Sequence, residues 1–261
     1  MFGRVARLQI GNVELEGLAI KFNVRRVPGK LDSAQIDVLG LSRDSFGLLG
    51  TPGTVSRLIA GYLDAVGTIV EGTTVPESLR RPVQDGEVIT SWQVRESGSR
   101  LASVRLSASW PGSVSAETVI AYVALQLGVA VAPVTLPKSP TYARGYVVTG
   151  TAGDVLTALA NDCGCRWSIH IGRLVLTPIS AGSGRVRVVR LDAKAGLVGW
   201  PETSDGGRVR ATALLQPGIM PGDRVQIGGR TLPGDYVVEQ VEHRGDSWDR
   251  DWYSTLLLRA A

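Results

Sequence analysis

The spacing of apolar residues changes twice along this chain of 261 residues. In the first region apolar and polar residues alternate in short runs, such as Arg4–Ile10 and Ser33–Leu39, and turn dipeptides such as Pro28-Gly29 separate the runs. Alternation with a period of two is typical of half-buried strands. The first region, residues 1–112, is therefore predicted to be rich in β-strands.

The same region contains two local signals. Residues 42–47 are predicted to form one short helical turn, with Ser42 as its N-terminal cap. Residues 88–96 and 100–109 both alternate, and Gly98-Ser99 lies between them. A glycine-containing turn between two alternating runs is typical of a β-hairpin, so these two runs are expected to pair with each other.

The middle region, residues 113–180, has helical spacing. After Ser115, a plausible N-cap, apolar residues recur on one helical face and Gly128 follows as a stop. A second helix is predicted from Thr151, because Asp154 stands three residues on as in a capping box. Residues 167–170 and 173–176 are expected to form a small hairpin around a Gly-containing turn. Two helices and a few short strands make a compact α+β module.

Alternation returns in the last region, residues 181–261, after a Ser- and Gly-rich linker. Six short runs with Pro-Gly and Gly-Gly turns between them indicate a small barrel or a sandwich. The predicted fold class is mainly β with an α+β insert, in three domains at 1–112, 113–180 and 181–261.

Few residues suggest catalysis. The chain has two histidines, His170 and His243, and lacks a Gly-x-Ser-x-Gly elbow, a phosphate-binding P-loop and a Gly-x-Gly-x-x-Gly motif after a strand. We interpret both histidines as surface or strand-end residues. The sequence therefore predicts a protein that is not an enzyme, with no catalytic residues and no cofactor.

Two clusters could hold a metal or a sugar, but each has a simpler interpretation. Cys163-Gly164-Cys165 is too tightly spaced for structural zinc, and its cysteines are expected to pack as small apolar residues. Asp246, Asp249 and Asp251 alternate with aromatic and basic residues. That segment could bind calcium or a sugar, although a solvated hairpin tip with a locally packed Trp is favoured. No metal-ligating or cofactor-binding residue is assigned.

The charge of the chain does not suggest tight binding of nucleic acid. Lys and Arg number 28 against 24 Asp and Glu, a net charge of +4, and the surplus is spread over all three regions. Arg185, Arg187 and Arg190 lie on one predicted strand, where regular alternation puts Arg185 and Arg187 on one face and Arg190 on the other. The strand has either a charged outer face or a contact row to a neighbouring subunit. The N-terminus has no apolar signal core and no apolar run reaches membrane-spanning length. A protein made in the cytoplasm is expected.

Three stretches, taken in order, resemble a known family. They comprise residues 36–42 with 57–62 and 67–72, residues 197–202 with 214–225, and residues 236–246 with 251–255. Their succession resembles the central baseplate hub of contractile-tailed bacteriophages, particularly of Mu-like phages, and more distantly the hub region of type VI secretion spike proteins. Regions 1–112 and 181–261 would then be two similar β-barrel domains that flank the two-helix α+β module.

The resemblance implies a mechanical role in the virion. Three subunits would form a ring of six similar barrels, which adapts the sixfold tail tube to the threefold central spike and encloses the channel for DNA ejection. The implied partners are two further copies, the tube, the spike and other baseplate proteins, with DNA passing transiently and no membrane insertion. The ring would assemble in the host bacterial cytoplasm and reside in the tail baseplate.

Other functions remain open from the sequence. One is a distal tail or tail-tip ring protein of another tail type. Another is a tail-associated protein that binds or degrades peptidoglycan. A third is a monomeric module whose residues 113–180 recognise a glycan.

Overall fold

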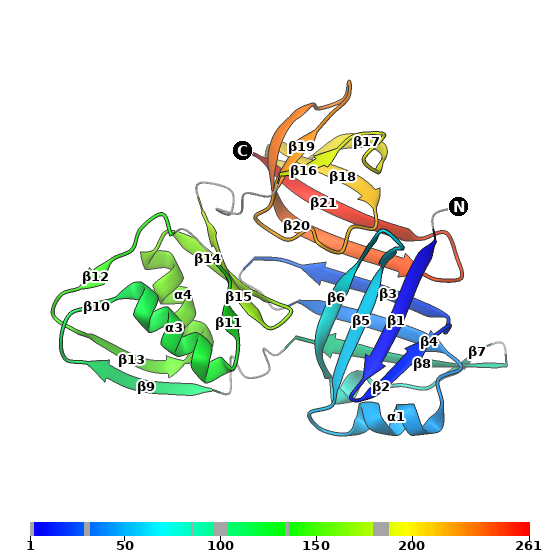
Figure 1. Ribbon diagram of the computed structural model, residues 1–261, viewed down its shortest axis with the longest axis horizontal. Coiled ribbons are helices and arrows are strands. Elements are labelled where there is room, and N and C mark those ends of the chain that lie inside the picture. Colours follow the sequence, from blue (N-terminus) through cyan, green and yellow to red (C-terminus); the bar gives the residue numbers. More distant parts are fainter. Residues whose placement is uncertain (1–2, 29–31, 85, 97–103, 134–135, 180–187) are drawn as a thin grey trace.

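The computed structural model describes residues 3–28, 32–84, 86–96, 104–133, 136–179 and 188–261. Two β-rich parts lie next to each other, and a part containing two helices lies to one side of them (Figure 1). Each part has its own cluster of buried apolar residues. The predicted fold class, mainly β with an α+β insert, is confirmed.

The first barrel is built from the strands of the N-terminal region. In its strands buried and exposed residues alternate, as the sequence predicts, and the inward residues form one core. The elements are β1 (Arg4–Ile10), β2 (Val13–Glu16), β3 (Ile20–Arg26), β4 (Ser33–Leu39), α1 (Arg43–Gly50), β5 (Val55–Tyr62), β6 (Ala65–Thr74), η1 (Pro76–Ser78), β7 (Val83–Gln84) and β8 (Glu87–Arg95).

Helix α1 begins where the sequence predicts it. The Ser42 hydroxyl accepts a hydrogen bond of 3.1 Å from the Ser45 N–H, which satisfies one of the donors at the helix start. The helix is longer than the single predicted turn, because Leu49 is buried against the first barrel and stabilises a second turn.

The middle module packs two helices against short strands. Ser115 and Thr151 cap the helices as predicted, and Gly128 ends the first helix with a φ of 72°. The elements are β9 (Arg105–Trp110), β10 (Val114–Ser115), α3 (Ala116–Leu127), β11 (Ala130–Val131), β12 (Thr141–Tyr142), β13 (Tyr146–Thr151), α4 (Ala152–Asp162), β14 (Cys165–His170) and β15 (Arg173–Pro178).

The predicted hairpin of residues 88–96 and 100–109 is wrong. Strand β8 pairs with β4, β6 and β7, whereas β9 pairs with β13. The reason is burial, because Leu106 of β9 packs in the core of the middle module. Gly98-Ser99, the expected turn, lies outside the described residues. Residues 104–110 thus pack with the middle module although they precede the expected boundary at residue 112.

The second barrel follows the middle module. Its core alternates in the same way along its longer strands. The elements are β16 (Val188–Leu191), β17 (Leu197–Ser204), η2 (Asp205–Gly207), β18 (Arg208–Leu214), β19 (Arg224–Ile227), β20 (Gly234–Asp246) and β21 (Trp252–Ala260).

One long strand joins the two barrels. Residues 234–237 of β20 pair with β19 inside the second barrel, and residues 241–246 pair with β3 of the first barrel. The pairing makes one sheet of 14 strands, with β17 and β2 at the two ends of its main path. The barrels are therefore fixed to each other by backbone hydrogen bonds as well as by side chains.

The two barrels share one pattern of strand pairing. Six strands of the first barrel match six strands of the second in chain order: β1, β3, β4, β5, β6 and β8 match β16, β17, β18, β19, β20 and β21. The pairs β3–β4, β4–β8, β5–β6 and β6–β8 have the counterparts β17–β18, β18–β21, β19–β20 and β20–β21. The pair β1–β5 corresponds to β16–β19, although the first is antiparallel and the second parallel.

The correspondence extends to single residues of the core. When the pair Ala34–Val94 of β4 and β8 is matched to the pair Val209–Leu258 of β18 and β21, Trp92 matches Leu256, and all six side chains are buried. The chain therefore contains two versions of one barrel, separated by the middle module.

Candidate functional site

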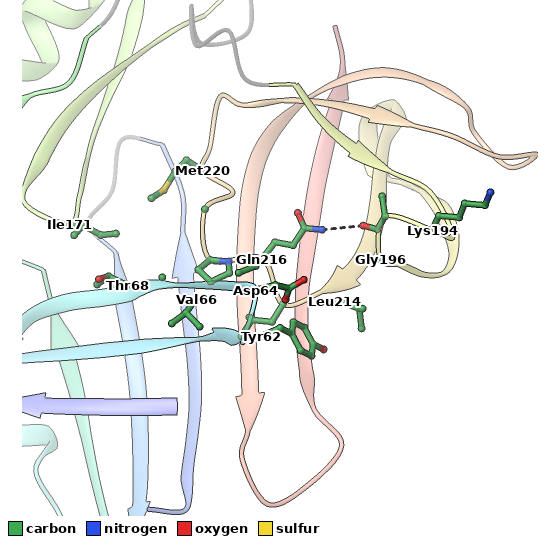
Figure 2. A pocket seen from close by; sticks show the side chains of 16 residues that line it. Tyr62, Asp64, Val66, Thr68, Ile171, Lys194, Gly196, Leu214, Gln216 and Met220 are labelled. Atoms are coloured by element: carbon green, nitrogen blue, oxygen red, sulfur yellow. Dashed lines mark hydrogen bonds between the residues drawn. The ribbon is translucent and has the colours of Figure 1, made fainter. Parts of the chain in front are cut away.

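An open groove of about 640 Å³ lies between the two barrels (Figure 2). The β5–β6 hairpin forms one wall with Tyr62 and Val66, and residues 214–220 form the other. The walls approach closely, because a Cβ on Gly67 would lie 3.1 Å from Cβ of Pro217. The charged residues of the lining are Asp64 and Lys194. The described lining contains no histidine or cysteine, so the groove resembles a seam between domains more than a catalytic pocket.

A buried polar cluster lies where the three parts of the chain meet. Its five residues come from all three parts. In the first barrel, Arg26 ends β3, Asp32 precedes β4 and Glu96 follows β8. His170 ends β14 of the middle module, and His243 lies in β20. All five are at most 2% exposed. We call this set the junction cluster.

Arg26 connects the first barrel to the second. Its Nη1 lies 3.2 Å from the carbonyl oxygens of Pro217 and Ile219, and Nη2 donates to the carbonyl oxygen of Ile69 in β6. A guanidinium has five N–H donors in a fixed plane, so one side chain can bind several carbonyl groups at once. Arg26 thereby holds the 217–220 loop against the first barrel.

Asp32 connects Arg26 to the middle module. Its Oδ2 lies 3.2 Å from Nε of Arg26, and its Oδ1 lies 2.9 Å from Nδ1 of His170. Burying a carboxylate is costly unless it is paired and hydrogen-bonded. The ion pair and the histidine contact supply those partners, so the position of the middle module is linked to that of both barrels.

Glu96 is the acid of the cluster that stays protonated. Burial, with the neighbouring charge of Asp32 as a second cause, raises the pKa of Glu96 to about 9. Its Oε1 accepts a hydrogen bond of 3.1 Å from the Gly172 N–H of the middle module. At neutral pH the carboxyl of Glu96 is therefore protonated and adds no second negative charge beside Asp32.

His243 is neutral in the fold. Burial and the positive charge of Arg26 hold the pKa of His243 well below its usual value. Its Nε2 lies 3.2 Å from Nη1 of Arg26 and accepts from it, which places the imidazole proton on Nδ1, 2.9 Å from the Ser254 hydroxyl. The Ser254 hydroxyl in turn accepts from the Gln216 N–H at the groove.

Three residues of the junction cluster have a spacing that could suit a metal ion. Ligand atoms of Asp32, Glu96 and His170 lie within 4.8 Å of one another. Arg26 already places a positive charge on Asp32, however, and a cation at this point would face the guanidinium at close range. The arrangement therefore suits an ion-paired connection between domains better than a metal centre.

Neither a protein-family profile nor any curated protein matches the sequence. Solved structures do match along nearly the whole chain. A tail protein from Neisseria meningitidis is 12% identical with a TM-score of 0.67, over 98% of this chain and 96% of its own length. The 43 kDa tail protein of prophage MuSo2 from Shewanella oneidensis is 10% identical with a TM-score of 0.67, over 99% and 98%.

This chain has the fold of phage tail proteins. A type VI secretion component from E. coli, c3393, has the same fold at 12% identity and a TM-score of 0.64, over 97% of this chain and 76% of its own length. That protein is described as structurally similar to the T4 bacteriophage tail proteins gp27 and gp5. These structural neighbours match the family that the sequence resembles.

The structure corrects the expectation that the two histidines are surface residues. His170 does end a strand, but both His170 and His243 are buried and neither is a surface residue. Their partners lie far away in the sequence: Asp32 is 138 residues from His170, and Arg26 is 217 residues from His243. No local motif could have identified the junction cluster.

The prediction of a locally packed Trp at the aspartate-rich hairpin tip is wrong, because Trp248 is 71% exposed and Trp252 is buried in the core of the first barrel. Other candidate residues lie as follows. Cys163 and Cys165 are free, buried members of the middle core, as predicted. Asp246, with Asp249 after it, is at the tip of the β20–β21 hairpin, where Oδ1 of Asp246 accepts N–H bonds that shape the turn. Arg190 is exposed and pairs with Asp192, whereas Arg185 and Arg187 lie outside the described residues.

Replacement of Glu96 by Gln is expected to change how stability depends on pH. A folded pKa of about 9, above the unfolded value of 4.5, means that the stabilisation is fully present below pH 4.5 and is lost as pH rises towards 9. The loss has a maximum slope of ~1.4 kcal/mol per pH unit. Urea titrations between pH 5 and 9 should show that slope reduced in E96Q. Glu87→Gln, at an exposed position of β8, should leave it unchanged, and an equal slope in E96Q would contradict this account.

Proposed function

We propose that this protein is a structural hub of a phage tail baseplate. Three copies form a ring of six barrels, which adapts a sixfold tail tube to a threefold spike and encloses the channel for DNA ejection. The observation that supports the proposal most strongly is the shared strand pairing of the two barrels. Identical contacts cannot join a sixfold ring to a threefold one, but two similar barrels per chain present six similar surfaces from three chains.

The partners of the proposed hub follow from its place in the tail. The tail tube would bind one face of the ring and the central spike the other, with further baseplate proteins around it. Structural similarity to tail proteins over nearly the whole chain supports this role. Among the described residues, no helix is both long and apolar enough to cross a membrane.

We propose a structural role in place of a catalytic one. The titratable residues that meet in the junction cluster are at most 2% exposed, so a substrate would not reach them. Degradation of peptidoglycan is the rival activity. Purified protein added to bacterial cell walls should leave their turbidity unchanged over hours, and clearing of the suspension would favour the hydrolase instead.

Symmetry separates the hub from a distal tail ring. Electron micrographs of the purified protein, alone or with its tail tube, should give class averages of a ring with six lobes and threefold symmetry. Six chains with true sixfold symmetry would contradict the hub and favour a distal tail or tail-tip ring of another tail type.

A further inference from the structure

The outer edge of β17 is open in a position where the first barrel has a partner. Strand β17 corresponds to β3, and β3 pairs with β4 on one edge and with β20 on the other. Strand β17 pairs with β18 on one edge, and the described residues provide no strand for its other edge. Most of β17 is exposed, and Trp200 is 74% exposed. An open edge of this kind is a template for another strand.

The shared pairing also identifies the counterpart of the strand that binds β3. Strand β20 is longer than β6, and only its first part, residues 237–238, matches β6 at residues 73–74. Through the matched strands β8 and β21, residues 242–246 of β20 correspond to residues 80–84 of the first barrel. That segment bonds to β8 on one edge, through the Arg80–Ser91 bridge and the β7–β8 pair. Its side chains are largely exposed, and Val83 is 69% exposed.

We infer that β17 of one copy pairs along the open edge of residues 80–84 in a second copy. The contact between copies would repeat the β3–β20 contact inside each chain. The inference rests on the proposed ring and names the strands that join neighbouring copies. The strand pairing does not itself set the number of copies, which comes from the proposed hub. In Figure 1, β17 and β7 lie apart on different barrels, so the two edges do not pair with each other within one chain.

Charge supports this pairing. Inside the chain, Nδ2 of Asn23 donates a hydrogen bond of 2.9 Å to Oε1 of Glu242, across the β3–β20 contact. With Ala34–Val94 matched to Val209–Leu258, Asn23 corresponds to Glu202 and Glu242 to Arg80. Between copies, the contact that corresponds to Asn23–Glu242 would therefore join the Glu202 carboxylate to the Arg80 guanidinium. The two residues would be diagonal neighbours across the strand pair, within reach of long side chains.

Apolar exposure supports it too. Gly245 pairs with Phe22 inside the chain. Val83 is the counterpart of Gly245, and the counterpart of Phe22 is the β17 bulge that contains Trp200. Two of the most exposed large apolar side chains would thus face each other across the contact and leave water together.

Mixing two single-cysteine variants tests the pairing. Ser204 and Arg80 are aligned as direct partners, and opposed residues of paired strands are close enough for a disulfide. Ser204→Cys mixed with Arg80→Cys is expected to give a cross-linked dimer on mild oxidation. The native cysteines are buried and should not interfere. Leu125→Cys, which is 73% exposed on α3, replaces Ser204→Cys as the control. A cross-link no stronger than this control would overturn the inference.

A charge exchange gives a second readout. Glu202→Arg should weaken self-association at least tenfold by placing like charges together, and the double variant E202R/R80E should restore it. A double variant that associates as weakly as E202R would contradict the pairing.

The cysteine double variant S204C/R80C separates the inference from the proposed hub. Cross-linked ladders that end at three chains support both. Ladders that end at another number support the pairing but contradict the threefold hub. A threefold ring that forms without the cross-link contradicts the pairing alone.

Discussion

Replacement of Arg26 by Ala is expected to lower the free energy of unfolding by about 3–5 kcal/mol. The substitution leaves Asp32 as a buried carboxylate without its ion pair, and it removes the donors from the carbonyl oxygens of Pro217 and Ile219. It also removes the donor to His243. Chemical denaturation followed by tryptophan fluorescence measures the change.

The neighbouring residue provides a matched control. Arg25 is exposed, and its contact across the same strand pair is a hydrogen bond of 3.0 Å to Gln240. Arg25→Ala should cost less than about 1 kcal/mol. If Arg26→Ala were as mild as Arg25→Ala, the junction cluster would not hold the three parts of the chain together.

Replacement of Trp252 by Ala should be as damaging, for a different reason. Trp252 belongs to β21 of the second barrel, but its ring is fully buried in the core of the first barrel. It lies edge-on to Phe22 at 5.5 Å, and its indole N–H donates to the Gly61 carbonyl at 3.1 Å. Truncation of such a side chain costs about 3–5 kcal/mol through lost burial and the cavity that remains.

The readout for Trp252→Ala includes cooperativity. Because one side chain completes the core of the other barrel, the two barrels of the natural protein should unfold in a single transition. The variant should shift that transition to lower denaturant and could separate it into two steps. Trp248→Ala, four residues away and 71% exposed, should change the unfolding free energy by less than ~0.5 kcal/mol. Equal effects of the two variants would contradict the packing described.

Local patterns predicted the local structure well. Ser115 and Thr151 cap their helices as expected. Each hydroxyl oxygen accepts a hydrogen bond from the N–H group three residues later, so the cap depends only on nearby residues. The strand predicted at residues 100–109 forms as β9, Arg105–Trp110, but its partner was not predicted, because alternation identifies the buried face of a strand and not the neighbouring strand.

The junction cluster could not be predicted in this way. Arg26 ends an alternating strand and looks like any other basic residue there, yet its partners come from β6, the 217–220 loop and β20. Those contacts exist only after β3 pairs with β20, across more than 200 residues of chain. The resemblance to tail hubs, by contrast, rests on several weak local signals that follow one another in the expected order along the chain. Structural neighbours that match nearly the whole chain have the same fold.

The molar mass in solution tests the central claim most directly. Light scattering behind a sizing column, over a range of concentrations and with the tube protein added, should give three times the 27.7 kDa of one chain. A mass of six chains would indicate a different tail ring. A monomer that persists at high concentration, even with the tube protein present, would contradict the claim that three copies form the hub.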